Sequence, residues 1–286
     1  MKNIKYFTQY ILIILLLLFF KIIGHKFALI ISSKLFSFFG PLFRSKKIIY
    51  SNLTNAFPNL NEFEKKKITK KMWCNYGKIL AEYVFIKNFR EIKLEQNVIV
   101  KGQEILDKIQ INKKPVIFIS GHFNNFELMA MHIDKSGIDL AAIYRPLNNK
   151  YLNTIMEKIR RNYICNKQVK KGIAGTKLLL KYFRNGTSIA LMIDQRVSQG
   201  LRSNFFNKKA STTTIPAQFI KKFKCDVVPI YIERTNNINF KITINKPIKF
   251  SDSSSIEVIT NDLNKVLEEM ILKNPEQWIW THDRWK

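Results

Sequence analysis

Residues 116–127, Val-Ile-Phe-Ile-Ser-Gly-His-Phe-Asn-Asn-Phe-Glu, constrain the fold more than any other stretch of this chain. The apolar residues 116–119 lie between a proline and a Ser-Gly pair, which predicts a short, fully buried strand. A helical pattern then runs to about Ser136, where Gly137 provides a stop. A buried strand that leads straight into a helix indicates an α/β fold, and open α/β sheets bind ligands beyond the carboxyl ends of their strands.

Two polar residues flank the start of this helix. His122 falls in the turn after Gly121, and Glu127 falls three residues after Asn124, the spacing of a capping box with Asn124 as N-cap. A neutral imidazole can take a proton from an alcohol that attacks an acyl carbon. A carboxylate on the other ring nitrogen fixes the tautomer and stabilises the imidazolium. The stretch therefore predicts His122 as a general base that Glu127 orients.

The same spacing has a simpler interpretation, in which Glu127 only caps the helix and His122 is an ordinary loop residue. Residues five apart do not share a face of a regular helix, so the two side chains meet only if His122 lies off the helix end. From these residues alone both interpretations stay open.

The N-terminus predicts a membrane anchor. Residues 10–20 are an unbroken apolar run that extends to 7–23, about the shortest length that spans a bilayer. A cleaved signal peptide is the alternative, but Lys-Ile-Ile-Gly-His-Lys follows where a small-residue cleavage site belongs. Lys on both sides of the run gives no clean orientation. Residues 27–43, interrupted by polar side chains, predict an interfacial helix that ends at Gly40 and Pro41.

The rest of the chain predicts alternating strands and helices. Residues 44–58 are a connector, and Asn61 with Glu64 forms a capping box at the start of a long helix. Strand patterns cover residues 98–100, 140–144, 188–193, 227–233 and 240–244, and helical patterns cover 151–161, 175–183 and 256–273. This order predicts an α/β fold with a parallel or mixed central sheet flanked by helices.

Arginine is scarce, which makes its positions informative. Of the 48 Lys and Arg residues only ten are Arg, so an Arg indicates a need for a planar, fork-shaped donor for phosphate or carboxylate. Arg145 and Arg196 follow predicted strands, and Arg160 lies on the helix after Arg145. The alternative for each is a surface cation or a structural ion pair. Asp194 also follows a strand, where it can hold a helix, pair with an arginine or orient a substrate.

The net charge of +27 favours acidic partners, although the abundance of Lys is partly a compositional habit. Anionic lipid, an acidic carrier protein and nucleic acid all fit this charge, but no nucleic-acid motif is present. The three cysteines are far apart with no Cys-x2-Cys spacing, which fits a reducing compartment and free thiols rather than a metal site.

Several blocks together resemble one family. The stretch from Gly121 to Glu127 is similar to the His-x4-Asp/Glu box of glycerolipid-type acyltransferases. Other blocks resemble the late acyltransferases of lipid A biosynthesis, the lauroyl and myristoyl transferases of lipopolysaccharide assembly. These blocks are Asn52-Leu53, Ala56-Phe57-Pro58, Tyr144-Arg145-Pro146, Asp194-Gln195-Arg196, Thr212-Thr213-Thr214 and Pro275-Glu276-Gln277-Trp278-Ile279-Trp280. The resemblance covers nearly the whole chain.

This resemblance implies a glycerol-3-phosphate acyltransferase-like fold, with a membrane anchor at residues 1–43 and an acyltransferase catalytic domain at 44–286. The enzyme would sit in the bacterial inner membrane, with its catalytic domain facing the cytoplasm. It would move a fatty acyl chain from acyl carrier protein to a hydroxyacyl chain of a lipid A precursor, with no cofactor and no metal. Anionic inner-membrane lipids are further expected partners, and nucleic acid is not.

The resemblance also assigns residues. It implies catalytic roles for His122, Glu127, Arg160 and Asp194, with Asp194 positioning an arginine or the acceptor. Arg145, with Gln195 and Arg196, would bind substrate, and Arg145 and Arg160 would hold phosphate. The tail departs from the family pattern because Asp283 replaces one of two arginines after His282.

Two alternatives stay open. A relative of this family could acylate another membrane lipid, such as a glycerophospholipid, an aminolipid or a mannosylated lipid. A basic, membrane-tethered protein could instead bind nucleic acid, which would require a basic face with exposed aromatic side chains.

Overall fold

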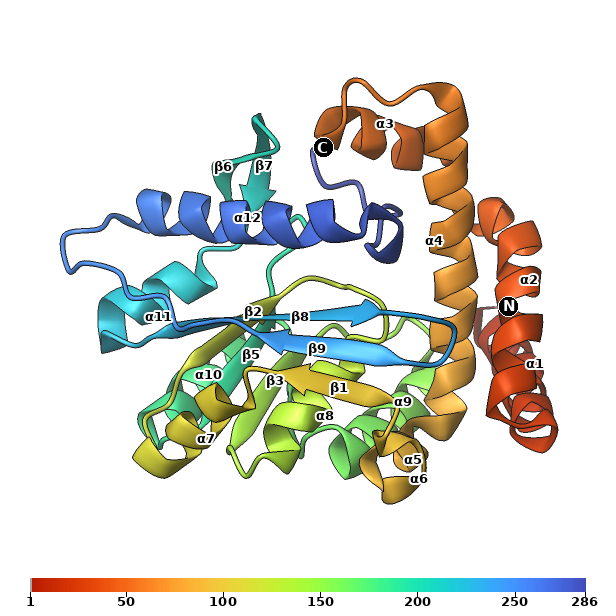
Figure 1. Ribbon diagram of the computed structural model, residues 1–286, viewed down its shortest axis with the longest axis horizontal. Helices are drawn as coiled ribbons and strands as arrows, with labels where there is room; N and C mark the ends of the chain where they lie inside the picture. Colours follow the sequence, from red (N-terminus) through yellow and green to blue (C-terminus); the bar gives the residue numbers. More distant parts are fainter. Residues whose placement is uncertain (1) are drawn as a thin grey trace.

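The structure is a computed structural model that describes residues 2–286, apart from the side chains of Lys2 and Ile92. Within these residues the centre is a 7-stranded sheet in the order β1-β9-β8-β2-β5-β3-β4 (Figure 1). Its strands are β1 (Val98–Lys101), β2 (Ile117–Ser120), β3 (Leu140–Tyr144), β4 (Lys167–Lys170), β5 (Ser188–Met192), β8 (Val227–Arg234) and β9 (Phe240–Ile244). The strands β2, β3, β4, β5 and β8 are parallel, and β9 runs against β8. The predicted mixed sheet is confirmed.

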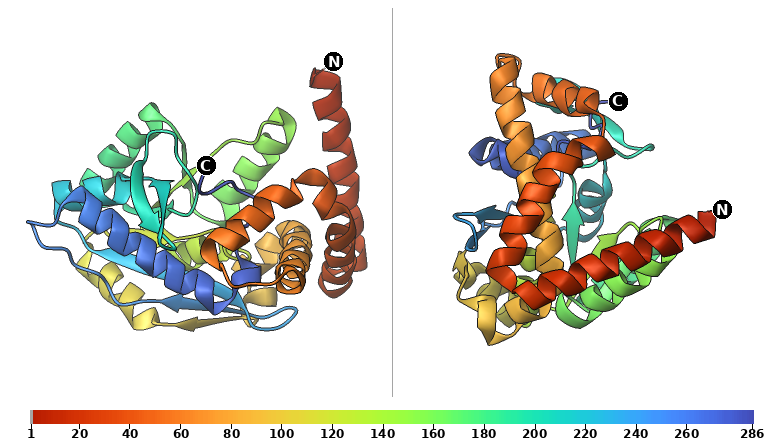
Figure 2. Two further views of the ribbon diagram at one scale, coloured as in Figure 1. Left: turned by 90° about the horizontal axis from the view of Figure 1, so that it is seen from above. Right: turned by 90° about the vertical axis from the view of Figure 1, so that its right-hand side faces the viewer.

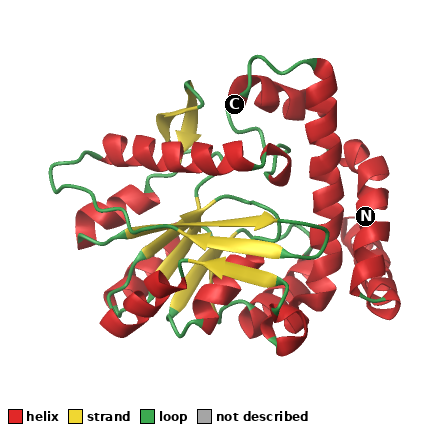
Figure 3. Ribbon diagram, viewed as in Figure 1, coloured by secondary structure: helices red, strands yellow, loops and turns green. Residues whose placement is uncertain are grey.

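Helices cover both faces of the sheet (Figure 3). In Figure 1, α7 (Gln103–Asn112) and α8 (Glu127–Lys135) lie below the sheet and α12 (Ile256–Lys273) lies above it. All four residues of β2 are buried, as expected for a central parallel strand covered on both faces. The other helices of this part are α5 (Ile86–Arg90), α6 (Ile92–Glu95), α9 (Lys150–Tyr163), α10 (Ile173–Arg184) and α11 (Ile215–Phe223).

A long helix, α4 (Glu62–Glu82), stands across the edge of the sheet toward which β8 points (Figure 1). It begins with the predicted capping box, in which the side chain of Asn61 accepts from Glu64 N–H and the Glu64 side chain accepts from Asn61 N–H. A short 3-10 helix, η1 (Tyr83–Phe85), continues the chain. The end of α4 therefore delivers Glu82 and Tyr83 to the carboxyl edge of the parallel strands.

Two apolar helices lie outside α4. They are α1 (Lys2–Ile23) and α2 (His25–Phe43), and they diverge from a turn at Gly24, whose φ is +81° (Figure 2). Both are long and apolar enough to cross a membrane. Beside α1 lies α9, where the Asn149 side chain donates to the Tyr6 carbonyl at 2.8 Å. Large apolar side chains stay exposed along α1 and α2, as expected for a membrane-facing surface.

The helix α2 does not end at Gly40 and Pro41 as expected, but continues to Phe43. Gly40 instead allows α2 to pack closely against α4, because a Cβ there would lie 2.5 Å from the Trp73 ring of α4. Gly77 of α4 likewise permits close approach, since its Cβ would lie 2.2 Å from the Ser32 carbonyl oxygen. The Ser32 hydroxyl donates to the Gly77 carbonyl at 2.6 Å, so α2 is fixed against the rest of the molecule.

The expected connector at residues 44–58 is largely a helix, α3 (Lys46–Ala56). Its buried side chains are Ile49, Asn52, Leu53 and Ala56, which recur at helical spacing on one face. A hairpin of β6 (Leu201–Phe205) and β7 (Lys208–Thr212) was also not predicted from the sequence. After α12 the chain forms η2 (Pro275–Gln277) and ends beside α3 (Figure 1). Residues 274–286 are called the tail below.

Candidate active site

His122 lies just beyond the carboxyl end of β2, as the sequence predicts. Gly121 is needed there, because a Cβ would lie 2.9 Å from both Leu267 of α12 and the Phe123 ring. The chain then turns through Asn124, whose φ is +44°, and α8 begins at Glu127. The loop therefore holds the imidazole off the helix end.

Asn124 is not the N-cap of this helix, so the predicted capping box between Asn124 and Glu127 is wrong. The N-cap residue is Phe126, which makes no side-chain cap. The Asn124 side chain instead donates to Gln277 of the tail and accepts from Arg234 Nε at 3.1 Å. Two tertiary partners thus replace the local hydrogen bond.

The carboxylate that holds His122 belongs to Asp194. Strand β5 pairs with β2 in parallel, with Ser120 opposite Met192, so the residues two beyond each partner meet at the same edge. His122 Nδ1 lies 2.8 Å from Asp194 Oδ1, and the His122 backbone N–H donates to Asp194 Oδ2 at 2.8 Å. The predicted direct pairing of His122 with Glu127 is therefore corrected, because parallel neighbouring strands bring Asp194 to the ring.

The two groups shift each other's pKa. Burial alone would lower the pKa of His122, but the charge and hydrogen bond of Asp194 outweigh burial and raise it above 6.5. Burial would raise the pKa of Asp194, yet His122 and the hydrogen bonds to the carboxylate lower it to about 2. Asp194 is therefore ionised near neutral pH and accepts from the Nδ1–H tautomer of His122.

This tautomer leaves Nε2 of His122 with a lone pair. Among the described residues no hydrogen bond is made to this atom, and 20% of the His122 side chain is exposed, against 2% for Asp194. A partly exposed imidazole with a free Nε2 and a buried carboxylate on Nδ1 is the arrangement of a general base.

Glu127 has different partners. Its Oε1 accepts from Arg160 Nε at 2.8 Å and from Arg160 Nη2 at 2.5 Å, and the Tyr83 hydroxyl donates to the same oxygen. Only 6% of the Glu127 side chain and 14% of the Arg160 side chain are exposed. Glu127 still favours the charged form of His122 through space. The two predicted catalytic residues Glu127 and Arg160 thus meet each other rather than His122.

Arg160 is fixed from several sides. Burial would lower the pKa of Arg160, but the charges and hydrogen bonds of Glu127 and Tyr83 together outweigh burial and raise it above its usual value. Its guanidinium carbon lies 5.7 Å from the centre of the Tyr144 ring at the end of β3, within cation–π range. Among the described residues, the hydrogen bonds of Arg160 are made by Nε and Nη2, and none is made by Nη1.

The three predicted substrate-binding residues are spread along the same edge. Arg145 is exposed after β3, and Gln195 and Arg196 are half-buried after Asp194. The backbone N–H of Arg196 donates to His282 Nε2 of the tail at 2.9 Å. None of their side chains makes a hydrogen bond to another described residue, so their substrate contacts stay predictions. Arg161, the neighbour of Arg160 on α9, forms an ion pair with Glu157 instead.

A buried polar network stabilises the loop that carries His122. Glu82 of α4, fully buried, pairs with Arg234 at the end of β8 through hydrogen bonds of 2.7 and 3.0 Å. The Asn125 side chain donates to the same Glu82 carboxylate at 3.1 Å. Together with the Arg234–Asn124 contact, this network fixes both asparagines between His122 and Glu127.

Several residues that position the site were not predicted from the sequence, although some of them lie in a recognisable sequence pattern. Arg234 follows a predicted strand, as Arg145 and Arg196 do, so the same argument applied to it. Tyr83 and Trp278 lie in predicted elements or motif blocks, yet nothing local indicates that Tyr83 reaches Glu127 or that Trp278 donates to Asp194.

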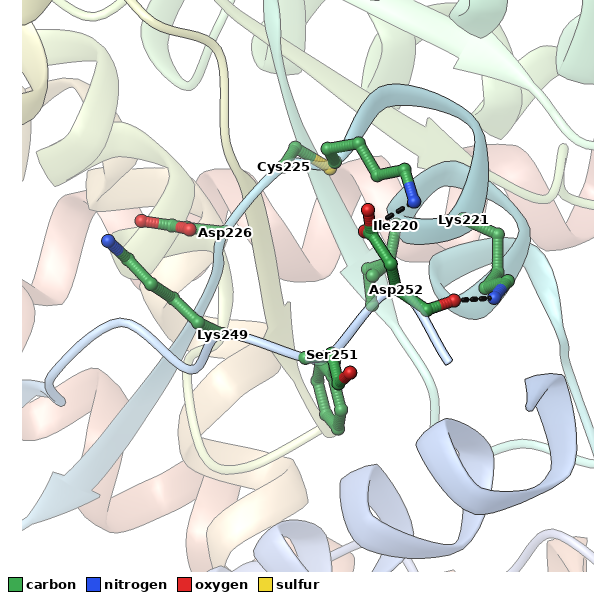
Figure 4. Close-up of a pocket in the computed structure, with 9 residues that line it drawn as sticks. Ile220, Lys221, Cys225, Asp226, Lys249, Ser251 and Asp252 are labelled. Atoms are coloured by element: carbon green, nitrogen blue, oxygen red, sulfur yellow. Dashed lines mark hydrogen bonds and ion pairs between the residues drawn. The ribbon is translucent and has the colours of Figure 1, made fainter. Parts of the chain in front are cut away.

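A hollow of about 200 Å³ lies away from this site, at the amino end of β8 (Figure 4). The Lys221 ammonium donates to the Asp252 carbonyl, and Lys224 pairs with the Asp252 carboxylate. His122 lies at the opposite, carboxyl end of the parallel strands, so the hollow is not part of its site. In residues 2–286, as described, no three His, Cys, Asp or Glu side chains gather in a group that could hold a metal ion.

Comparison with known proteins gives a match along the whole chain. The family described as bacterial lipid A biosynthesis acyltransferase matches residues 1–286. The lipid A biosynthesis lauroyltransferase of Escherichia coli (strain K12) is 24% identical over 251 residues, which cover 85% of this chain and 79% of that protein. The myristoyltransferase of the same pathway and strain is 24% identical over 263 residues, covering 89% and 80%. A lipid A biosynthesis acyltransferase of Haemophilus influenzae (strain ATCC 51907 / DSM 11121 / KW20 / Rd) is 23% identical over 271 residues, covering 92% and 83%.

Proposed function

Because this chain belongs to the bacterial lipid A biosynthesis acyltransferase family, we propose that it moves a fatty acyl chain from acyl carrier protein to a hydroxyacyl chain of a lipid A precursor. Acyl transfer in lipid A synthesis is the activity of the family. The donor, the acceptor hydroxyl and the residue roles are the further steps of the proposal. Relatives named as lauroyl-, myristoyl- and palmitoleoyltransferases support a fatty acyl chain as the transferred group.

One observation carries the chemistry: His122 Nδ1 is held by the ionised Asp194, and Nε2 has no hydrogen bond within the described chain. The proposed reaction needs a base that removes a proton from an alcohol, and no metal or other cofactor is required for that step. Position supports this role, since the pair lies at the carboxyl edge of the parallel strands, where α/β proteins bind their ligands.

The proposed mechanism has two proton transfers. His122 Nε2 takes the proton of the acceptor hydroxyl as its oxygen attacks the carbonyl carbon of the acyl thioester. The carbon–sulfur bond then breaks, and the departing thiolate takes the proton back from Nε2–H. An ester and the free carrier thiol result, and Asp194 stabilises the imidazolium between the two transfers.

Glu127 and Arg160 take a supporting electrostatic role in this proposal. Glu127 and Tyr83 hold the guanidinium on one side, so that Nη1 of Arg160 is preorganised for an anion such as a phosphate of the glycolipid or of the carrier's phosphopantetheine. Arg145, exposed at the same edge, is the second proposed phosphate ligand. Gln195 and Arg196 complete the proposed substrate-binding set.

The N-terminal helices support a membrane location. We propose that α1 spans the inner membrane uncleaved, that α2 lies at the interface, and that the catalytic domain faces the cytoplasm, where carrier-bound acyl chains are made. The net charge of +27 would favour contact with anionic lipids and with the acidic carrier.

A direct assay tests this function. Membranes that contain the protein are incubated with lipid A precursor and with acyl carrier protein loaded with chains of different length, and the lipids are weighed by mass spectrometry. One added acyl ester is expected with the wild type and none with His122→Ala. Acylation of a phospholipid, aminolipid or mannosylated lipid in place of the precursor would support the alternative acceptors. The nucleic-acid alternative receives no support from the family.

A further inference from the structure

The tail contacts the catalytic loop through its backbone. Phe123 and Trp278 form an antiparallel β-bridge, and Asn124 N–H donates to the Gln277 carbonyl at 3.0 Å. The tail therefore lies directly against the residues that follow His122 in the chain.

The indole of Trp278 reaches the carboxylate that holds His122. Trp278 is buried, and its Nε1–H donates to Asp194 Oδ2 at 2.9 Å. The same oxygen accepts from the His122 backbone N–H, which leaves Oδ1 opposite the imidazole. Because two donors hold Oδ2, the carboxylate cannot rotate freely away from Nδ1.

The position of the indole is itself fixed. Its ring packs edge-on against Trp280 at 4.6 Å between centroids. Trp280 Nε1–H donates to the Pro275 carbonyl within the tail. Asn52 of α3 donates to the carbonyls of Trp280 and His282 at 2.9 and 2.7 Å. The helix that was expected to be a connector thus clamps the tail in place.

We infer that Trp278 is a positioning residue for the reaction proposed above: through its N–H it aligns Asp194 and thereby selects the tautomer of His122 that carries its lone pair on Nε2. The inference rests on the proposed function for its effect on rate. Its effect on the tautomer of His122 does not depend on which lipid is acylated.

A second tryptophan of the tail provides a matched control. Trp278→Phe removes the donor to Asp194, whereas Trp285→Phe removes an indole N–H that donates to the Phe205 carbonyl at 3.1 Å and leaves Asp194 untouched. Neither change alters the other titratable groups whose charge acts on Asp194 or His122, which are Tyr76, Glu127, Arg160, His282 and Arg284.

The test uses the full chain in detergent micelles with ¹⁵N-labelled histidine. Above the pKa of His122, the wild type and Trp285→Phe should show the Nδ1–H tautomer, and Trp278→Phe should show a mixture of the two tautomers. In the acylation assay, kcat should fall on the order of tenfold for Trp278→Phe with KM little changed. Trp285→Phe should stay within about twofold of the wild type in kcat, because it keeps every donor to Asp194.

A sulfur isostere separates the effect of the lost N–H from any effect on folding. Benzothienylalanine, which replaces the indole N–H by sulfur and keeps the bicyclic shape, is placed at 278 and, as a control, at 285. It should reproduce the tautomer mixture only at 278. An unchanged tautomer with the isostere at 278, or equal effects at both positions, would overturn the inference. A wild type without transferase activity but with these tautomer shifts would count against the proposed function alone.

Discussion

His122 Nδ1 and Asp194 Oδ1 lie 2.8 Å apart, although 72 positions separate the two residues in the chain. They meet because β2 and β5 are parallel neighbours whose carboxyl ends stop at the same edge of the sheet. The backbone N–H of His122 binds the other oxygen of the same carboxylate. This double contact fixes the imidazole relative to the sheet as well as its tautomer.

Asp194→Asn should therefore remove most activity while the protein stays folded. The amide oxygen can still accept from the His122 backbone and from Trp278, but the amide nitrogen then faces Nδ1 and favours the Nε2–H tautomer. The equivalent change in a Ser-His-Asp triad costs about 10⁴ in kcat, and we expect a loss of at least about 10² here. Acylation rates and melting temperature measure both effects. A variant with more than half of the wild-type turnover would contradict the role of Asp194.

The pKa of His122 predicts how activity depends on pH. The base must be neutral to take a proton, and the Asp194 charge raises its pKa above 6.5 despite burial. Activity should therefore fall as pH drops through a value above 6.5, while Asp194, with a pKa of about 2, stays ionised. A plot of kcat/KM against pH should place the acidic limb above 6.5. A limb at or below 6.5 would show that burial outweighs the charge and hydrogen bond of Asp194 at the catalytic base.

The sequence predicted those elements whose pattern is local. The strands β3 and β9 and the helix α12 have the predicted boundaries, because alternating or helical apolar spacing decides them without distant partners. By contrast, residues 44–58 were expected to be a connector but form α3. The buried face of this helix includes Asn52, a polar residue that binds the tail 228 positions away in the chain. A local sequence pattern contains no information about such a distant partner.

The members of the site were predictable, but their pairing was not. His122, Glu127, Arg160 and Asp194 were all singled out, and all four lie together at one edge. Which carboxylate meets the imidazole depends on β5 lying beside β2, and strand order is a property of the whole sheet. Asn124 shows the same limit. Its side chain binds Arg234 and Gln277, which lie 110 and 153 positions away in the chain, instead of capping the helix that follows it.

The buried pair of Glu82 and Arg234 predicts a large effect on stability. Glu82→Gln should leave the guanidinium without its charge partner inside the protein, which costs about 3–5 kcal/mol for a buried pair. The control is Glu91→Gln, which removes an exposed pair with Lys87 and should cost no more than about 1 kcal/mol. Denaturant unfolding of the protein in micelles measures both variants. Similar losses for the two would show that the buried pair does not hold the loop.

The apolar surface of α1 predicts firm membrane attachment. Alkaline carbonate should leave the full-length chain in the membrane pellet. Leu12 and Leu15 are more than half exposed in the protein alone, so replacing both with Arg should release much of it, because each Arg in the bilayer costs about 2.5–3.5 kcal/mol. Ile173→Arg, at an exposed position of α10, should change nothing. A wild-type chain that is shortened and soluble would contradict the anchor.

The pair of Glu127 and Arg160 can be distinguished by its stability effect from both interpretations of the His-x4-Glu spacing. A helix cap or a direct partner of His122 would leave stability almost unchanged in Glu127→Gln. In the structure, however, Glu127 neutralises a largely buried guanidinium and accepts from Tyr83. Either Glu127→Gln or Arg160→Met should therefore cost about 3 kcal/mol, and the double variant should cost little more than one of them.

The same cycle on Glu157 and Arg161 supplies the control. This pair is four residues apart on the outside of the same helix as Arg160, with 42% of the Arg161 side chain exposed, and its coupling should not exceed about 0.5 kcal/mol. Arg160→Lys should lose most activity, because the single ammonium nitrogen of Lys cannot hold Glu127 and also present a separate nitrogen to an anion as the planar guanidinium does, whereas Arg184→Lys should stay near the wild type. Strict additivity at Glu127 and Arg160 would mean that the two side chains act separately. The direct His122–Glu127 pairing would then have to be reconsidered.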